Sequence, residues 1–173
     1  MGNIASLVTR RLEVRPLTEA DRGRFVDLMC DDGFMIFSNG TRTAEEANRR
    51  FDHMLAVCDE VPFAKQPVIE RASGSIVGYV GVDWFDLDNE RCLEFGYRLA
   101  PEYRGLGYAT EASEALLGKA AETFAGDIFA IIHRENLASQ KVARKLGFEY
   151  LTYRVILGAP RNLYRIHLNP AAS

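Results

Sequence analysis

Apolar and polar positions follow two periods along this chain, and the change of period separates strands from helices. Alternation over 12–17 predicts a first strand that ends near a proline. Helical spacing follows over 18–30, opened by a capping threonine with acidic residues behind it. A second helix is predicted over 43–59, opened by a threonine–glutamate capping box. The first third of the chain therefore predicts one strand and two helices.

Beyond Pro62 the pattern changes to strands joined by tight turns. Three strands, over 63–71, 76–85 and 91–99, are expected to form an antiparallel meander. The continuous apolar run over 128–132 is typical of a strand buried on both faces. The remaining elements are a helix over 107–124, a helix over 137–146 that ends at Gly147, and strands over 148–156 and 162–168. This order predicts an α/β fold, with a mixed and mostly antiparallel central sheet flanked by helices.

The composition limits the class of protein. The chain has 173 residues, 47% of them hydrophobic and 26% charged, which is typical of a globular domain. No repeat, linker or low-complexity segment divides the sequence, so we expect one domain over residues 1–173. The formal charge of −3 lacks the basic excess that nonspecific nucleic-acid binding requires. Nucleic acid is therefore not an expected partner.

Cysteine usage and apolar runs give expectations about metal and membrane. Cys30, Cys58 and Cys92 have no zinc-site spacing, and their odd number gives no disulfide framework, so we expect buried thiols and no metal. The apolar stretches are too short to cross a bilayer. Residues 1–6 fit the N-myristoylation pattern, but no basic cluster supplies a second anchoring signal. We expect a soluble, cytoplasmic protein without a membrane partner.

The segment over 94–112 carries the most chemistry. It predicts a strand, then a turn with two glycines, then an amphipathic helix. Gly105 and Gly107 permit positive φ, and the first N–H groups of the helix lack internal partners, so the turn forms an anion site. Arg104 adds a positive charge beside this site. The same pattern occurs in simple connections, so the turn alone leaves phosphate binding and mere connection open.

Two other phosphate-binding motifs do not fit the turn. A P-loop ends in Gly-Lys followed by Ser or Thr, and no lysine follows the glycines here. The dinucleotide motif needs a third glycine three residues after the second, where Thr110 stands instead. A protein that binds ATP phosphates through this turn is therefore the weakest of the functional hypotheses.

Several segments together resemble a known family. The run over 104–109 matches the Arg/Gln-x-x-Gly-x-Gly/Ala acyl-CoA signature of the GNAT superfamily of N-acetyltransferases. The stretches over 94–97 and 110–112 look like the RimJ/RimL-type branch, and 136–148 is similar to the second CoA segment of that branch. Residues 9–18 resemble its first strand. Because these segments stand in the expected order over nearly the whole chain, the resemblance predicts a GNAT-like fold and acetyl-CoA as the cosubstrate.

The resemblance also implies the cofactor-binding residues. The pyrophosphate of acetyl-CoA would lie on the turn, and the pantetheine arm would pair with the strand that ends at Leu99. Asn136 would contact the pantetheine from the other side of the cleft. The turn residues implied in this role are Arg104, Gly105, Leu106, Gly107, Tyr108 and Ala109.

Three residues are candidates for catalysis. The backbone N–H of Tyr97 is predicted to face the thioester oxygen, although a β-bulge there would shift the assignment by a residue or two. Glu94 is the candidate base for the amine proton, with a merely salt-bridged glutamate as the alternative. Ser139 stands where some relatives carry a tyrosine that acts as general acid, and an ordinary helical serine is the rival interpretation. The apolar residues over 34–37 are expected to line the acceptor pocket or to fill the core.

The predicted reaction is acetyl transfer from acetyl-CoA to a primary amine by direct attack in a ternary complex. The acceptor is either a small molecule or a protein N-terminus, and the protein either a monomer or a homodimer. The alternative is a catalytically silent acyl-CoA-binding module that serves regulation. The presence of Glu94 favours the enzyme, whereas Ser139 in place of a tyrosine favours the silent module.

Overall fold

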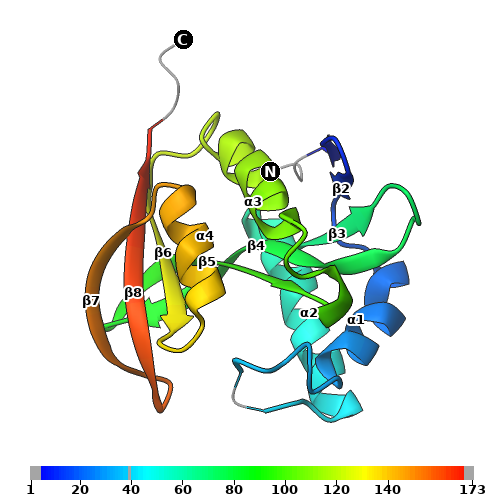
Figure 1. The fold of residues 1–173 in the computed structure, drawn as a ribbon, viewed down its shortest axis with the longest axis horizontal. Helices are drawn as coiled ribbons and strands as arrows, with labels where there is room; N and C mark the ends of the chain where they lie inside the picture. Colours follow the sequence, from blue (N-terminus) through cyan, green and yellow to red (C-terminus); the bar gives the residue numbers. More distant parts are fainter. Residues whose placement is uncertain (1–4, 39, 170–173) are drawn as a thin grey trace.

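The computed structural model describes residues 5–38 and 40–169, so the beginning of the myristoylation-like segment lies outside the described residues. Eight strands form one sheet in the order β1-β2-β3-β4-β5-β6-β8-β7 (Figure 1). The strands are β1 (Leu7–Val8), β2 (Leu12–Val14), β3 (Gln66–Glu70), β4 (Ile76–Leu87), β5 (Glu90–Leu99), β6 (Gly126–His133), β7 (Glu149–Ile156) and β8 (Ala159–Leu168).

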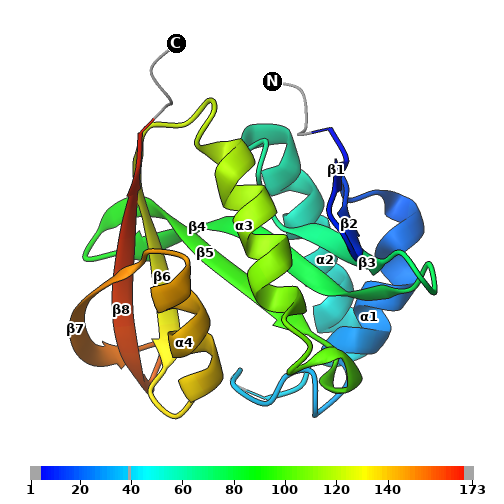
Figure 2. The ribbon, with the colours of Figure 1, turned by 45° about the horizontal axis from the view of Figure 1, so that its top comes forward.

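Four α-helices and two short 3₁₀ turns complete the described chain. They are η1 (Glu19–Asp21), α1 (Arg22–Met29), α2 (Ala44–Glu60), η2 (Pro101–Tyr103), α3 (Tyr108–Ala120) and α4 (Leu137–Lys145). Helices α1 and α2 pack on β4 from one face, whereas α3 packs on β2, β4 and β5 and α4 on β6. Figure 2 shows α3 in front of β4 and β5, with α2 behind them. The predicted class, a mostly antiparallel sheet flanked by helices, is confirmed.

The starts of the first two helices follow their capping residues. The Thr43 hydroxyl accepts a hydrogen bond from the Glu46 N–H at 3.2 Å, and the Glu46 carboxylate accepts one from the Thr43 N–H at 2.8 Å. The predicted capping box is therefore confirmed, and its two bonds satisfy N–H groups that the helix leaves unpaired. The first helix differs from the prediction, because its first turn is the 3₁₀ turn η1 and α1 begins only at Arg22.

The apolar run over 128–132 was predicted to be a strand buried on both faces, and this prediction is wrong. In β6 only Ile128 and Ala130 are buried, while Phe129, Ile131 and Ile132 are partly exposed. The strand alternates because α4 covers one of its faces. Ile131 and Ile132 on this strand line a cavity. The continuous apolar run therefore does not mean full burial here, because part of the strand faces a cavity.

The burial of the three cysteines also differs in part from the prediction. Cys58 is buried and Cys92 half-buried, but Cys30 is exposed at the end of α1. Burial raises the pKa of the Cys58 thiol to about 11, so this thiol is neutral at physiological pH.

Among the described residues, no helix is both long enough and apolar enough to cross a membrane.

The feature of the fold that creates a site is the separation of β5 from β6. These are the only parallel neighbours in the described sheet, and they pair only at Leu93–Ile128 and Glu94–Phe129. Beyond Glu94 the strands diverge, and β5 continues to Leu99 beside β4 alone (Figure 2). One backbone edge of β5 between Phe95 and Leu99 therefore has no strand partner. An extended ligand can pair with such an edge.

Candidate active site

Three adjoining cavities occupy the opening between β5 and β6. The first, the turn cavity, measures about 450 Å³ and is lined by Gly105, Gly107, Tyr97 and Ser139 among others. The second, the central cavity, measures about 140 Å³ and shares Tyr97 and Ser139 with the first. The third, the basic cavity, measures about 330 Å³ and shares Glu94 with the central one. The shared side chains place the three cavities side by side, and we describe them together as one cleft across the sheet.

The glycine turn has the conformation that an anion site requires. Gly105 and Gly107 have φ of 74° and 81°, in the left-handed region that favours glycine. Gly107 is the N-cap of α3, and the first hydrogen bond into the helix runs from the Glu111 N–H to the Gly107 carbonyl. The N–H groups between them have no partner within the helix and lie at its positive end. Ala109 and Thr110 line the turn cavity there.

The side chains of the turn hold its shape. Arg104 donates to the Leu99 carbonyl at 3.0 Å and to the Gly33 carbonyl at 2.7 Å, so its guanidinium ties the turn to the end of β5. The Tyr108 hydroxyl donates to Glu70 at 2.6 Å, away from the cleft. Leu106 is exposed and is not among the residues that line the turn cavity.

Hydrogen bonds and an ion pair connect this turn to the N-terminal segment, and sequence reasoning did not find them. Glu111, in the first turn of α3, accepts hydrogen bonds from the Thr9 hydroxyl at 2.6 Å and from the Arg11 N–H at 2.8 Å. The Arg11 guanidinium pairs with the same carboxylate and donates to the Leu106 carbonyl at 2.8 Å. Burial would raise the pKa of Glu111, but these hydrogen bonds outweigh it and lower the pKa. The carboxylate is therefore ionised and fixed at physiological pH.

Two predicted residues meet where the turn cavity joins the central cavity. The Tyr97 hydroxyl lies 3.1 Å from the Ser139 hydroxyl, although β5 and α4 are 42 residues apart in sequence at these positions. Asn136 is the N-cap of α4, and its side-chain oxygen accepts from the Ser139 N–H at 3.1 Å. Asn136 also lines both cavities. The prediction concerned the Tyr97 backbone, so the position of its hydroxyl is a further finding.

Glu94 points to the opposite side of β5, into the central and basic cavities. Its carboxylate lies 3.6 Å from the Lys65 ammonium, with the side chain about 20% exposed. Burial raises the pKa of Glu94 above that of an ordinary glutamate, and Lys65 only partly opposes this effect. A carboxylate with a raised pKa is closer to the working range of a general base than an exposed one.

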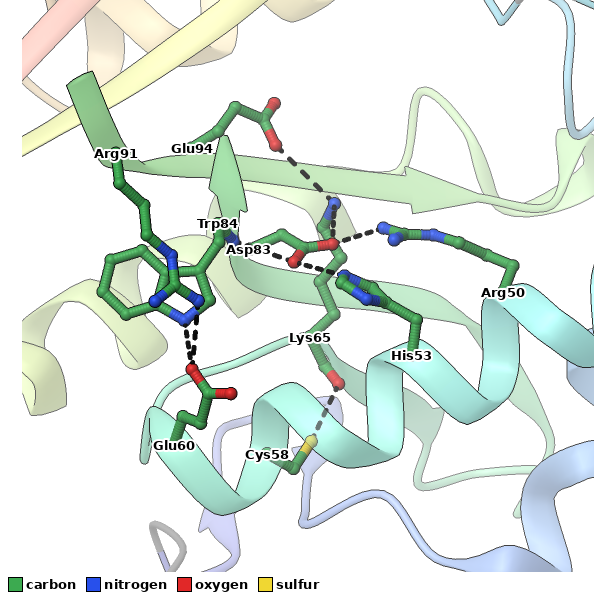
Figure 3. A network of polar contacts seen from close by, with 9 residues as sticks. All are labelled: Arg50, His53, Cys58, Glu60, Lys65, Asp83, Trp84, Arg91 and Glu94. Atoms are coloured by element: carbon green, nitrogen blue, oxygen red, sulfur yellow. Dashed lines mark hydrogen bonds and ion pairs between the residues drawn. The ribbon is translucent and has the colours of Figure 1, made fainter. Parts of the chain in front are cut away.

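Asp83, which sequence reasoning did not single out, is the cross-strand partner of Glu94. It accepts from Arg50 at 2.5 Å and contacts His53 at 2.9 Å, and the Lys65 ammonium lies 3.8 Å away, between the two carboxylates (Figure 3). Burial alone would raise the pKa of Asp83, but these cations and hydrogen bonds lower it. The cluster therefore holds one ionised carboxylate behind one whose pKa is raised.

The loop between α1 and α2 contributes to both core and cleft. Phe34 and Met35 are buried, whereas Ile36 is exposed and lines the turn cavity. Phe37 lines all three cavities and lies 5.8 Å from the His133 ring. The core interpretation is thus confirmed for Phe34 and Met35, whereas a role in the acceptor pocket for Ile36 and Phe37 stays a prediction.

The cleft has a helix-capping glycine turn at one end and the half-buried Glu94 at the other. The acetyltransferase (GNAT) domain family matches residues 11–149 of this chain. The chain belongs to the GNAT acetyltransferase family. This match confirms the family resemblance predicted from the sequence, and with it the assignment of the chain as an acetyltransferase.

Individual relatives agree with the family. The GNAT domain is 28% identical over 158 residues to YkkB of Bacillus subtilis, covering 87% of this chain and 88% of YkkB. It resembles the structure of an acetyltransferase from Agrobacterium tumefaciens with a TM-score of 0.78 and 27% identity, covering 96% of each chain. RimL, a ribosomal L7/L12 alpha-N-protein acetyltransferase in complex with coenzyme A, has a TM-score of 0.79 at 16% identity, covering 96% of this chain and 100% of RimL. The fold of the RimJ/RimL-type branch is thus among the neighbours.

Proposed function

We propose that this GNAT domain transfers an acetyl group from acetyl-CoA to a primary amine by direct attack in a ternary complex. The observation that carries the proposal is the single cleft that joins the glycine turn to Glu94 through the Tyr97–Ser139 pair. An anion site and a candidate base then lie at opposite ends of one path across the sheet. Acetyl-CoA would supply the acetyl group as a thioester.

The residues around the turn cavity fit the two parts of acetyl-CoA. The N–H groups at the start of α3, with Gly105 and Gly107, would hold the pyrophosphate. The edge of β5 that lacks a strand partner up to Leu99 would pair with the pantetheine arm, and Asn136 would face it across the cleft. The Tyr97 N–H is our candidate for the hydrogen bond that stabilises negative charge on the thioester oxygen.

Proton transfer on the amine side is assigned to Glu94. A primary amine must lose a proton before or during attack, and a carboxylate within the cleft can accept it, directly or through water. The Lys65 ammonium lies 3.6 Å from Glu94 and 3.8 Å from Asp83, so Glu94 shares this cation with a second carboxylate. Burial and the Asp83 charge raise the pKa of Glu94, which makes it a better proton acceptor than an ordinary glutamate.

On the thiol side we assign a supporting role to the two hydroxyls. The Tyr97 and Ser139 hydroxyls are hydrogen-bonded to each other at the junction of the cavities, so one of them can donate to the departing sulfur. Tyr97 supplies the phenol that the sequence pattern lacked at position 139. Burial raises the pKa of Tyr97, which keeps this hydroxyl protonated and available as a donor.

The acceptor is a primary amine, either small or at a protein N-terminus. RimL, a fold neighbour, is described as an alpha-N-protein acetyltransferase, which supports a protein N-terminus. The basic cavity, at about 330 Å³, has the size of a small-molecule site. The silent acyl-CoA-binding module is disfavoured by Glu94, which a binding role for the turn does not require.

The proposal is tested by incubating the purified protein with acetyl-CoA and a panel of amines, and measuring free CoA release and the mass of each product. The panel holds peptides with free N-termini, polyamines, aminoglycosides and amino acids. We expect amine-dependent CoA release with a product 42 Da heavier than the acceptor, the mass of the added acetyl group. Binding of acetyl-CoA without turnover of any amine would support the silent module instead.

A further inference from the structure

Arg161 on β8 is a buried cation whose guanidinium makes no hydrogen bond or ion pair with the described part of the chain, and Glu94 acts on it only at longer range. The residue is only 9% exposed, and its Nε is buried without a hydrogen-bond partner. No ion pair joins it to any described carboxylate within 4 Å. Burying a charge without compensation is unfavourable, so buried charges in proteins are usually paired with an opposite charge. The position of Arg161 therefore calls for an anion.

The other buried and half-buried charged groups that line the basic cavity already have partners, whereas Arg42 is exposed. Arg50 and Lys65 face Asp83, and Lys65 also faces Glu94. Arg98 donates to the Phe34 carbonyl at 3.1 Å and to the Tyr79 hydroxyl at 3.3 Å. Glu94 is the carboxylate that lines the basic cavity, against the cations Arg42, Arg50, Lys65, Arg98 and Arg161. The cleft therefore has a positive excess, and Arg161 is its buried member without a partner.

Arg161 also stands in the right place to meet an acceptor. It lines both the central and the basic cavity, as Glu94 does. A molecule that places its amine at Glu94 therefore also lies near Arg161. The planar guanidinium fits a carboxylate with two parallel hydrogen bonds, which a point charge such as lysine does not match. Apolar side chains, among them Met29, Met54, Phe85 and Ile131, line the rest of the basic cavity.

We propose that the acceptor is a small amine that also carries a carboxylate, as an apolar amino acid does, and that Arg161 holds this carboxylate while Glu94 faces the amine. The inference rests on the proposed function, since it names the acceptor class of the same cleft. Arg161 is a specificity-determining residue here, because it contacts the substrate away from the bond that forms. The acetyl group is transferred to the nitrogen and the carboxylate stays unchanged.

The first experiment compares matched acceptors at saturating acetyl-CoA. Leucine, methionine and phenylalanine are each tested beside their amides and their decarboxylated amines, with 1-aminophosphonates and short peptides as further arms. We expect kcat/KM for the free acids to exceed that for the amides and amines by on the order of 100-fold, because only the acids pair with the buried cation. A higher rate with phosphonates than with carboxylates would mean that Arg161 binds a phosphonate or phosphate group, and would overturn the proposal of a carboxylated acceptor.

The second experiment changes the cation. Arg161→Gln should lower kcat/KM for the free acids by about 100-fold and leave the amides nearly unchanged, so that discrimination disappears. Arg161→Lys keeps the positive charge without the planar guanidinium, and should lower kcat/KM for the free acids roughly tenfold. Arg165→Gln is the matched control, since Arg165 lies on the same strand, is partly exposed and faces Asp127 at 3.5 Å. It should keep the full discrimination.

A merely structural role for Arg161 gives different results. If the residue supported the fold, Arg161→Gln would lower the melting temperature, whereas removing an uncompensated buried charge should keep or raise it. Equal rates for acids, amides and peptides, or discrimination that survives in Arg161→Gln, would overturn the inference and leave the proposed function intact. A panel in which no carboxylated amine is acetylated also overturns the inference. Turnover of any other amine of the panel in the same samples would then show that the proposed function stands, and acetyl-CoA binding without any turnover would show that it fails as well.

Discussion

At the scale of single residues, the most informative pair is Asp83 and Glu94. They are cross-strand partners on β4 and β5 with Lys65 between them, yet their pKa values move in opposite directions. Environments that separate the pKa values of neighbouring carboxylates are typical of acid–base sites. Sequence reasoning found Glu94 through its strand and the family resemblance. It missed Asp83 because the Arg50 and His53 side chains that bind it come from α2, at least 30 residues earlier.

Glu94→Gln should lower kcat by about 10²–10⁴-fold, the usual contribution of a general acid–base group, with the affinity for acetyl-CoA nearly unchanged. Because burial raises the pKa of Glu94, wild-type activity should fall, as pH decreases, already above the range of an ordinary glutamate. The base is then protonated, and this limb should be absent in the variant. Steady-state kinetics against pH measure both effects. Glu90→Gln on the exposed start of the same strand is the control, and turnover of Glu94→Gln within about threefold of wild type would make Glu94 structural.

The hydroxyl pair gives a second prediction at this scale. Tyr97→Phe and Ser139→Ala should each lower kcat by about tenfold or more, and the double variant should lose less than the product of the two. The hydroxyls are hydrogen-bonded to each other, so removing one already disturbs the other. Single-turnover rates of the three variants measure this coupling. Fully multiplicative losses would mean that the hydroxyls act independently, and Tyr150→Phe, exposed on β7, is the control for loss of a phenol.

At the scale of elements, most boundaries followed from local sequence chemistry. The capping box of α2 and the β3–β4–β5 meander are confirmed, because caps and alternation are local properties. The two-residue β1 carries too short a pattern to predict. The divergence of β5 and β6 could not be predicted from the sequence either, because no residue pattern within the two strands indicates where their parallel pairing ends. The turn over 104–109 was found because its glycines are required by backbone geometry.

Gly107→Val should weaken acetyl-CoA binding by more than tenfold. A Cβ at position 107 would lie 3.3 Å from the Arg11 guanidinium. The valine would also have to adopt φ of 81°, which a β-branched residue rarely does. Reshaping the turn misaligns the N–H groups at the start of α3. Calorimetric titration with acetyl-CoA measures the loss. Gly74→Val is the matched control, because Gly74 has φ of 70°, open space around an added Cβ and no part in the lining of the three cavities. It carries similar backbone strain and should bind acetyl-CoA normally. Unchanged affinity in Gly107→Val would remove the turn from the site.

At the scale of the whole molecule, the cleft lies where two parts of the sheet are joined by a short parallel pairing. On one side β1 to β5 carry α1, α2 and α3, and on the other β6, β8 and β7 carry α4. Two residue pairs of β5 and β6 join the two parts of the sheet directly. A ligand that lies along the free edge of β5 and also contacts Asn136 on the other side adds a bridge between them. Binding should therefore stabilise the whole fold.

Acetyl-CoA should raise the melting temperature by about 5–10 °C at a concentration one hundred times its dissociation constant. Ligand binding to the native state at that ratio contributes about 2.7 kcal/mol, and each kcal/mol shifts the melting temperature of a protein this size by about 2–4 °C. ATP at the same concentration should shift it far less, because the turn lacks a P-loop lysine and the pantetheine-like arm is missing. Thermal denaturation followed by circular dichroism measures both, with Gly107→Val losing the acetyl-CoA shift. An equal shift with ATP would mean that the cleft recognises phosphates alone, and that the free edge of β5 takes no part in binding.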